Sequence, residues 1–319
     1  MNHFIYYVNK MGNNKSKTIY KSYETHEAFN TALRNSGLEK CNLLFAIDFT
    51  KSNLSQGTNT FNGKSLHYIK DQEPHNDILE SPPPYNRVVS IGKTLTFHGI
   101  TDKEKEQNKS LLNQLNPYQW ALSVSGSQLE SFDDDHLIPT CIFGYARSSI
   151  EPYVKEIYDS NNDIRGCHGI DGVIEAYENS VRNIGLSGNT QFAPIIEWAL
   201  QKVSQNYEYH VLVIIGDGCI EDLERTKECL KKACSYPLSV IFIGVGDGSN
   251  PDKKDKWKSM RDLDDNPTGN VDNWQSVYLT NIKDNLEKSP RPDLEFAVHL
   301  FSEIPEQYKY FKKFGLIKN

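Results

Sequence analysis

Runs of consecutive apolar residues along the chain predict three buried strands. They are residues 43–47 (LLFAI), 209–215 (YHVLVII) and 238–245 (LSVIFIGV). Such runs are typical of parallel strands that are buried on both faces, whereas strands with one solvated face alternate between apolar and polar residues. Shorter apolar segments predict further strands at residues 137–143, 153–158 and 276–279.

Segments with helical periodicity separate the predicted strands. For example, residues 169–184 place Val173, Ile174 and Tyr177 on one helical face. Strands that alternate with helices predict an α/β fold, a doubly wound and mostly parallel sheet flanked by helices, with right-handed crossovers. The predicted helices cover residues 24–37, 117–132, 169–184, 192–203, 220–234 and 293–313.

The same pattern divides the chain into an arm and one domain. Residues 1–23 are rich in Asn and Lys and predict a loosely ordered N-terminal arm or an edge strand. Residues 24–319 form the predicted domain, which carries a long insertion at about 53–115. The proline run in 82–84 interrupts any regular element there.

Oxygen-bearing side chains follow two of the buried strands. Asp48, Thr50 and Ser52 are spaced i, i+2, i+4 after the first strand, Asp217 follows the strand at 209–215, and Thr190 precedes a helix. The carboxyl ends of parallel strands share one sheet edge, where open α/β folds bind ligands. Hard cations such as Mg²⁺ prefer oxygen ligands of this kind. A second interpretation is that these residues only cap turns and helices.

Together these residues spell Asp-x-Thr-x-Ser, then Thr, then Asp-Gly, which resembles the metal-ion-dependent adhesion site of von Willebrand factor A domains. The chain is similar to the copine branch of that family. Within that branch, its sequence motifs most resemble those of the copine-like domain of plant RING-type ubiquitin ligases. The similarity covers roughly residues 25–315. The motifs that carry it are IDFTKSN (47–53), FNGKSLHYI (61–69), NPY (116–118), FDDDHLIP…FG (132–144), GNTQFAPII (188–196), HVLVIIGDG (210–218), LSVIFIGVGDG (238–248) and EIPEQY (303–308).

The resemblance implies a non-catalytic protein-binding module with one metal site. It implies that Thr50 and Ser52 bind Mg²⁺ (or Mn²⁺ or Ca²⁺) directly, that Asp48 and Asp217 act directly or through water, and that Thr190 binds in one of two ligand states. A carboxylate offered by a partner protein would fill the open coordination position. The family often has Thr, Ser or Ala before the second aspartate; here the residue is Gly216, which should loosen the loop slightly.

Composition narrows the classes of function. The net charge of −7 and the pI near 5.8 argue against nucleic acid as the main partner. No apolar run approaches the roughly 20 residues of a membrane-spanning helix, so direct membrane insertion is not expected. The six cysteines lack paired zinc spacings and predict reduced thiols in a cytoplasmic protein, with a cytoskeletal association left open. The oligomeric state is also open.

Two other functions remain as alternatives. The domain could serve as a structural or scaffold subunit of a larger assembly that uses the fold independently of metal. It could also be a component of a ubiquitin-ligase pathway that needs a RING partner, because no RING-type set of Cys and His ligands follows Asp247. Catalysis by the chain itself is not expected.

Weaker motifs predict little. The segment from Gly57 to Lys64 nearly spells a phosphate-binding loop, but its glycines are spaced wrongly and no helix-forming run begins at Lys64. His168 and His210 are interpreted as satisfied polar groups rather than metal ligands. The acidic runs at 133–135 and 262–265 are interpreted as solvated loops, with a second cation as the weaker alternative.

Overall fold

The computed structural model describes residues 5–7, 19–21, 25–70, 115–218, 220–248, 255–289 and 291–318. Its centre is a sheet of six strands in the order β10-β9-β8-β3-β5-β6. All neighbours in this sheet are parallel except β6, which pairs antiparallel with β5. The strands are β3 (Asn42–Asp48), β5 (Thr140–Phe143), β6 (Val154–Ile157), β8 (His210–Gly216), β9 (Leu238–Gly244) and β10 (Trp274–Tyr278).

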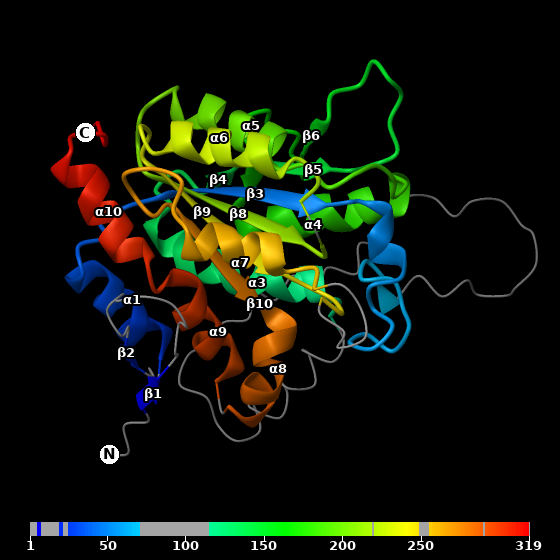
Figure 1. Cartoon of the computed structure of the whole chain (residues 1–319), viewed down its shortest axis with the longest axis horizontal. Helices are drawn as coiled ribbons and strands as arrows, with labels where there is room; N and C mark the ends of the chain where they lie inside the picture. The colour runs from blue at the N-terminus through cyan, green and yellow to red at the C-terminus, as the bar shows by residue number, and fades with distance from the viewer. Residues whose placement is uncertain are drawn as a thin grey trace, which may run out of the picture.

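Helices cover both faces of this sheet (Figure 1). One face packs against α1, α3, α4, α9 and α10, and the other packs against α5, α6 and α7. This confirms the predicted doubly wound α/β fold. The helices are α1 (His26–Asn35), α3 (Pro117–Leu129), α4 (Gly169–Asn183), α5 (Ala193–Val203), α6 (Leu223–Ala233), α7 (Lys258–Asp265), α8 (Leu279–Lys288), α9 (Pro292–Phe301) and α10 (Ile304–Lys313).

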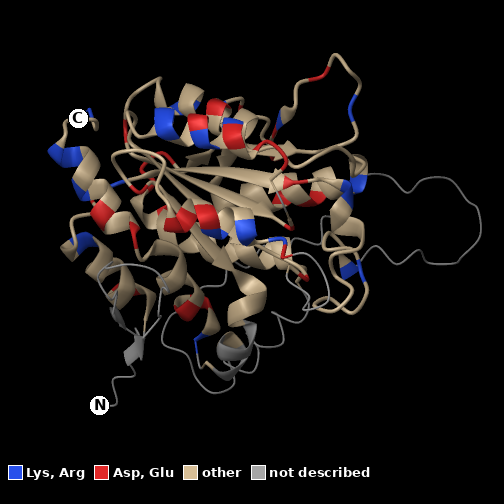
Figure 2. Ribbon diagram, viewed as in Figure 1, with Lys and Arg blue, Asp and Glu red and all other residues tan. Residues whose placement is uncertain are grey.

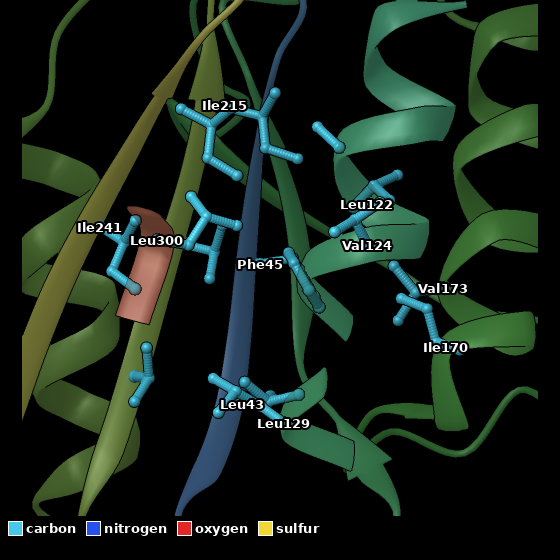
Figure 3. Close-up of a cluster of buried hydrophobic side chains, with 14 of the residues drawn as sticks. Leu43, Phe45, Leu122, Val124, Leu129, Ile170, Val173, Ile215, Ile241 and Leu300 are labelled. Carbon is cyan, nitrogen blue, oxygen red and sulfur yellow. The ribbon is translucent and has the colours of Figure 1, made fainter. Parts of the chain in front are cut away.

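Burial of β3 on both faces explains its apolar run. Leu43 and Phe45 belong to the core on the face covered by α3 and α4, and Figure 3 shows Leu43 beside Leu129 and Phe45 on the side of the strand that faces α3. Leu44 and Ala46 alternate with them and belong to the core on the opposite face. The side chains at 43–47 are 0% exposed, so the inference of a central strand from uninterrupted apolar residues was correct.

Smaller elements lie around this frame. Strand β4 (Leu137–Ile138) pairs with β7 (Cys167–His168), and β1 (Ile5–Tyr7) pairs with β2 (Ile19–Lys21), both in antiparallel register. The short 3-10 helices η1 (Lys51–Leu54) and η3 (Glu130–Phe132) follow β3 and α3. The division into an arm and one domain stays a prediction, and residues 71–114 of the expected insertion lie outside the described residues.

The C-terminal region departs from the sequence prediction. The prediction of a single helix over 293–313 is wrong, because α9 ends at Phe301 and α10 begins at Ile304. Pro305 lies in the first turn of α10, where it needs no N–H partner, and proline disfavours helical geometry in the residue before it. Helices α7 and α8 were not predicted.

Figure 2 shows Lys, Arg, Asp and Glu interspersed on the outer helices, as is typical of a solvated surface.

Candidate metal centre

Two buried carboxylates meet where β3 and β8 end. Asp48 is the last residue of β3, and Asp217 directly follows its parallel neighbour β8. The backbone N–H of Asp217 donates to Asp48 Oδ2 at 3.4 Å. Both side chains are 0% exposed. A Cβ at Gly216 would lie 3.1 Å from Asp48 Oδ2, so the glycine leaves room for this carboxylate.

The two hydroxyls of the Asp-x-Thr-x-Ser motif complete a chain of hydrogen bonds. The Thr50 N–H donates to Asp48 Oδ1 at 2.7 Å and fixes the turn after the strand. Thr50 Oγ1 lies 3.0 Å from Ser52 Oγ, which donates to Asp217 Oδ1 at 2.8 Å. The structure therefore brings four of the five sequence-predicted residues into one network.

Thr190, the fifth predicted residue, lies on the neighbouring loop before α5. Its side chain is buried, and its carbonyl accepts a hydrogen bond from the Glu221 N–H at 2.8 Å, which ties this loop to the segment after Asp217. The same loop is tied to the first motif, because the Ser187 N–H reaches the carbonyls of Phe49 and Gly144, each at 3.0 Å. Backbone hydrogen bonds thus tie the loop of Thr190 to both segments that carry the network.

Gly144 makes the close approach of these loops possible. Its φ of +68° is in the region that favours glycine, and a Cβ there would lie 2.3 Å from Thr50 Cγ2. Any side chain at this position would push the Thr50 loop away from β5. Packing of the site therefore requires the glycine that ends the motif at 132–144.

The two carboxylates of the network carry more negative charge than the groups around them neutralise. Burial raises the pKa of Asp48 to about 6, and hydrogen bonds from Thr50 oppose the rise. Burial and the charge of Asp48 raise the pKa of Asp217 well above its usual value, and the hydrogen bond from Ser52 and the charge of Lys256 oppose this rise. Among the described residues, no hydrogen-bond partner reaches the buried Asp217 Oδ2. Adjacent buried carboxylates are costly unless a cation or protons compensate them.

The donor set fits a hard divalent cation. It offers carboxylate and hydroxyl oxygens, with neither sulfur nor imidazole among them, and Mg²⁺ prefers oxygen ligands. With only two acidic side chains the site depends on its hydroxyls, and in the described ranges no group of three or more His, Cys, Asp and Glu side chains could hold a metal. The acidic runs at 133–135 and 262–265 form no such group, and the prediction that they are solvated loops is wrong for Asp133 and Asp264, which are buried, and for 262–265, which lie in α7.

Sequence reasoning missed the residues that lie directly behind this network. Asn53 Nδ2 donates to the Thr50 carbonyl at 3.1 Å, and Tyr118 Oη donates to Asn53 Oδ1 at 2.6 Å. His67 lies 2.8 Å from the Asp48 carbonyl through Nε2 and 2.9 Å from Tyr177 Oη through Nδ1. Three of these four residues were inside quoted motifs (IDFTKSN, FNGKSLHYI and NPY), which was the available signal.

Other sequence candidates have structural roles. His168 lies 3.1 Å from the buried carboxylate of Asp159, and His210 Nδ1 lies 2.8 Å from the Glu208 carbonyl, so both are satisfied polar groups as predicted. In the segment that resembles a phosphate loop, a Cβ at Gly57 would lie 2.2 Å from the Lys64 carbonyl oxygen. That loop is closed by its own backbone, which leaves no phosphate cradle.

Comparison with known proteins decides the family. Residues 110–319 match the sequence profile of the Copine family. The chain belongs to the copine family. The predicted membership of the copine branch and the predicted mostly parallel sheet between helices are therefore confirmed.

Two relatives illustrate the range of the family. The E3 ubiquitin-protein ligase RGLG2 of Arabidopsis thaliana is 34% identical over 92% of this copine chain and 55% of its own length. Copine family protein 2 of Caenorhabditis elegans is 31% identical over 93% of this chain and 3% of its own length. The chain thus spans about half of the plant ligase. The activity of the ligase belongs to that whole protein.

Solved structures give a looser match. A manganese-loaded TRAP protein of Plasmodium vivax covers 76% of this chain and 70% of its own, with 12% identity and a TM-score of 0.38. Proximal thread matrix protein 1 of the mussel byssus, with a zinc-occupied adhesion motif, gives a TM-score of 0.34 at 11% identity. These values are too low to carry an argument about the site.

In the described part of the chain, no helix is both long and apolar enough to cross a membrane.

Proposed function

We propose that this copine domain captures a partner protein through a divalent cation of the Mg²⁺ type, with Mn²⁺ or Ca²⁺ as alternatives. Asp48, Thr50, Ser52, Thr190 and Asp217 would hold the cation. The observation that carries this proposal is the hydrogen-bonded chain from Thr50 through Ser52 to Asp217 Oδ1. The other oxygen of that buried carboxylate, Oδ2, has no hydrogen-bond partner among the described residues.

Each residue has a separate task in this proposal. Asp48 and Asp217 supply the negative charge, and their burial at the ends of β3 and β8 keeps water from compensating it. Ser52 donates its proton to Asp217 and faces the Thr50 hydroxyl with one lone pair, so a second lone pair of its oxygen is left for a cation. A bound divalent cation supplies an open coordination position, and a carboxylate of a partner is the ligand that such a position favours.

The experiment is an affinity capture from cytosol with the purified chain as bait. Wild type, Asp48→Ala and Asp217→Ala are each compared in Mg²⁺ and in EDTA. Glu208→Gln is the matched control, because Glu208 lies two residues before the opposite end of β8. We expect a partner that is lost in both site variants and in EDTA, and retained by the control. Partners that are indifferent to metal and to the site variants would contradict the proposal and favour the scaffold function.

The resemblance to plant ligases favours one second candidate. A domain that is 34% identical to an E3 ubiquitin-protein ligase could select substrates in a ubiquitin-ligase pathway, with the RING supplied in the same or another chain. The captured proteins would then include ubiquitin-conjugated species or a RING protein. If ubiquitin transfer proceeds at the same rate with and without the chain in a reconstituted reaction, this second candidate fails.

A further inference from the structure

Behind the candidate metal site lies a buried polar network whose hydrogen-bond directions can be derived. The carbonyls of Asp48 and Thr50 can only accept hydrogen bonds. Asn53 lies against both, at 3.5 and 3.1 Å, so its amide nitrogen must face them. Its Oδ1 then faces Tyr118, whose hydroxyl donates to it at 2.6 Å. The orientation of the Asn53 amide is therefore fixed from both sides.

This orientation propagates into the ligand hydroxyls. Asn53 Nδ2 also lies 3.4 Å from Thr50 Oγ1 and can only donate to it. Ser52 Oγ donates to Asp217, so it accepts from Thr50 Oγ1. The chain of donors thus runs in one direction, from Tyr118 through Asn53, Thr50 and Ser52 to Asp217. An inverted Asn53 amide would place oxygen against oxygen at both backbone carbonyls.

His67 gives a second anchor to the same loop. Its Nε2 is 2.8 Å from the Asp48 carbonyl, so Nε2 carries the proton. The neutral ring then presents a bare Nδ1, which accepts from the Tyr177 hydroxyl at 2.9 Å. Burial lowers the pKa of His67 to about 3, which agrees with a neutral ring. The ring stacks on Tyr118 at a centroid distance of 4.2 Å, so the two anchors form one unit.

The location of this unit indicates its role. The ladder hydrogen bonds of β3 end near Asp48, and the ligand residues Thr50 and Ser52 lie beyond the strand. All four supporting side chains are at most 3% exposed, so water does not replace their hydrogen bonds. Residues that orient metal ligands typically change metal affinity by about 10–100-fold when substituted.

We propose that Asn53 and His67 are positioning residues of the metal site, held in their hydrogen-bonding orientations by the hydroxyls of Tyr118 and Tyr177. This inference rests on the proposed metal binding. It adds that the affinity of the site depends on groups that do not touch the ion, on α3 and α4 as well as on the ligand loops.

The test compares tyrosine hydroxyl deletions by Mn²⁺ titration, with free Mn²⁺ followed by electron paramagnetic resonance. Tyr118→Phe and Tyr177→Phe should each weaken Mn²⁺ binding about tenfold or more. The matched control is Tyr209→Phe. Tyr209 is also buried and loses one hydrogen bond, to Ser239 at 2.7 Å, but it lies at the other end of β8. This control should bind Mn²⁺ as wild type does.

A second pair of variants separates positioning from general packing. His67→Phe keeps the stacking on Tyr118 but removes the donor to Asp48, and it should weaken Mn²⁺ binding about tenfold or more. His67→Gln restores a side-chain amide donor and should recover most of the affinity. If Tyr118→Phe and His67→Phe fold and bind Mn²⁺ like wild type, or if His67→Gln is as weak as His67→Phe, the positioning role is wrong. If wild type itself binds no Mn²⁺, the proposed function fails and this inference fails with it.

Discussion

The two ends of the strand pair β3 and β8 treat carboxylate charge in opposite ways. At the amino end, Glu208 accepts hydrogen bonds from Lys40 at 2.7 Å and from Asn42 at 3.0 Å. These partners lower the pKa of Glu208, and the Lys40 pKa is raised in return. At the carboxyl end, burial raises the pKa values of both Asp48 and Asp217. One sheet therefore carries a neutralised acid at one end and two under-neutralised acids at the other.

The difference teaches how to tell a structural carboxylate from a functional one. A carboxylate that only supports the fold can be paired with Lys or with amides, as Glu208 is. Two adjacent carboxylates buried at a strand end cost stability in the metal-free protein. That cost is offset when a divalent cation binds between them. The raised pKa values are thus a property that the proposed metal-binding function would explain.

The largest predicted effect is on metal-dependent stability. Divalent metal at 100 times its Kd should raise the free energy of unfolding of wild type by about 2.7 kcal/mol, because only the folded chain has the site. Asp217→Asn should show almost none of this increment, whereas Glu208→Gln should keep it. Urea unfolding with Mn²⁺ and with EDTA measures the difference. Equal increments in both variants would mean that the metal binds elsewhere.

The next predicted effect is that Asp217→Asn, which loses the stabilisation by metal, stabilises the metal-free protein. In EDTA at pH 7.5, Asp217→Asn should be more stable than wild type by about 0.5–2 kcal/mol, which is the common gain of a stabilising substitution. The physical reason is that the amide keeps the hydrogen bond from Ser52 but removes a buried charge beside Asp48. Urea unfolding in EDTA measures it. A metal-free Asp217→Asn less stable than wild type would show that the two carboxylates do not repel.

A third prediction concerns pH. The folded, metal-free Asp48 has a pKa of about 6, above the unfolded value of about 3.9, so the folded state holds more protons than the unfolded state between these values. Metal-free stability from this group should therefore fall as pH rises through that window. Protons also compete with the metal, so Mg²⁺ affinity should fall by up to about tenfold per pH unit below pH 6. Calorimetric titrations of Mg²⁺ between pH 5 and 7.5 measure this affinity. An affinity that does not change with pH would contradict the raised pKa of Asp48.

The smallest predicted effect is at the amino end. Glu208→Gln should lower the free energy of unfolding at pH 7 by about 0.5 kcal/mol, because the pair with Lys40 is partly exposed and screened by solvent. The sign follows from the lowered pKa of Glu208, whose contribution is present above the unfolded pKa and is lost as pH falls through the folded value. If Glu208→Gln stabilised the metal-free chain as Asp217→Asn should, the contrast between the two ends would disappear.

Much of the fold was predictable because its central strands are apolar without interruption. The strands at 42–48, 210–216 and 238–244 were found within about one residue. Helix α7 was missed because Lys258–Asp265 is mostly charged and buries few side chains. The break between α9 and α10 was missed although Pro305 marks it. Local pattern therefore located the sheet but not every helix boundary.

The candidate site was predictable only in part, for a different reason. The i, i+2, i+4 spacing of the first motif is local and can be read from one loop. The support of that loop is not local, because His67 is brought to Asp48 by the fold of residues 55–69, and Tyr118 comes from α3. In the same segment, Asp247 accepts hydrogen bonds from Asn59 and Thr60, which lie 188 and 187 residues away in the sequence. Such partners are visible only in three dimensions.

The measurement that tests the account most directly is a calorimetric titration of Mg²⁺ and Mn²⁺ into the metal-free chain at pH 7.5, with Asp217→Asn beside wild type. Wild type should bind one ion per chain with saturation, and the variant should lose this binding. Binding that is absent from wild type, or unchanged in Asp217→Asn, would contradict a metal centre at the ends of β3 and β8.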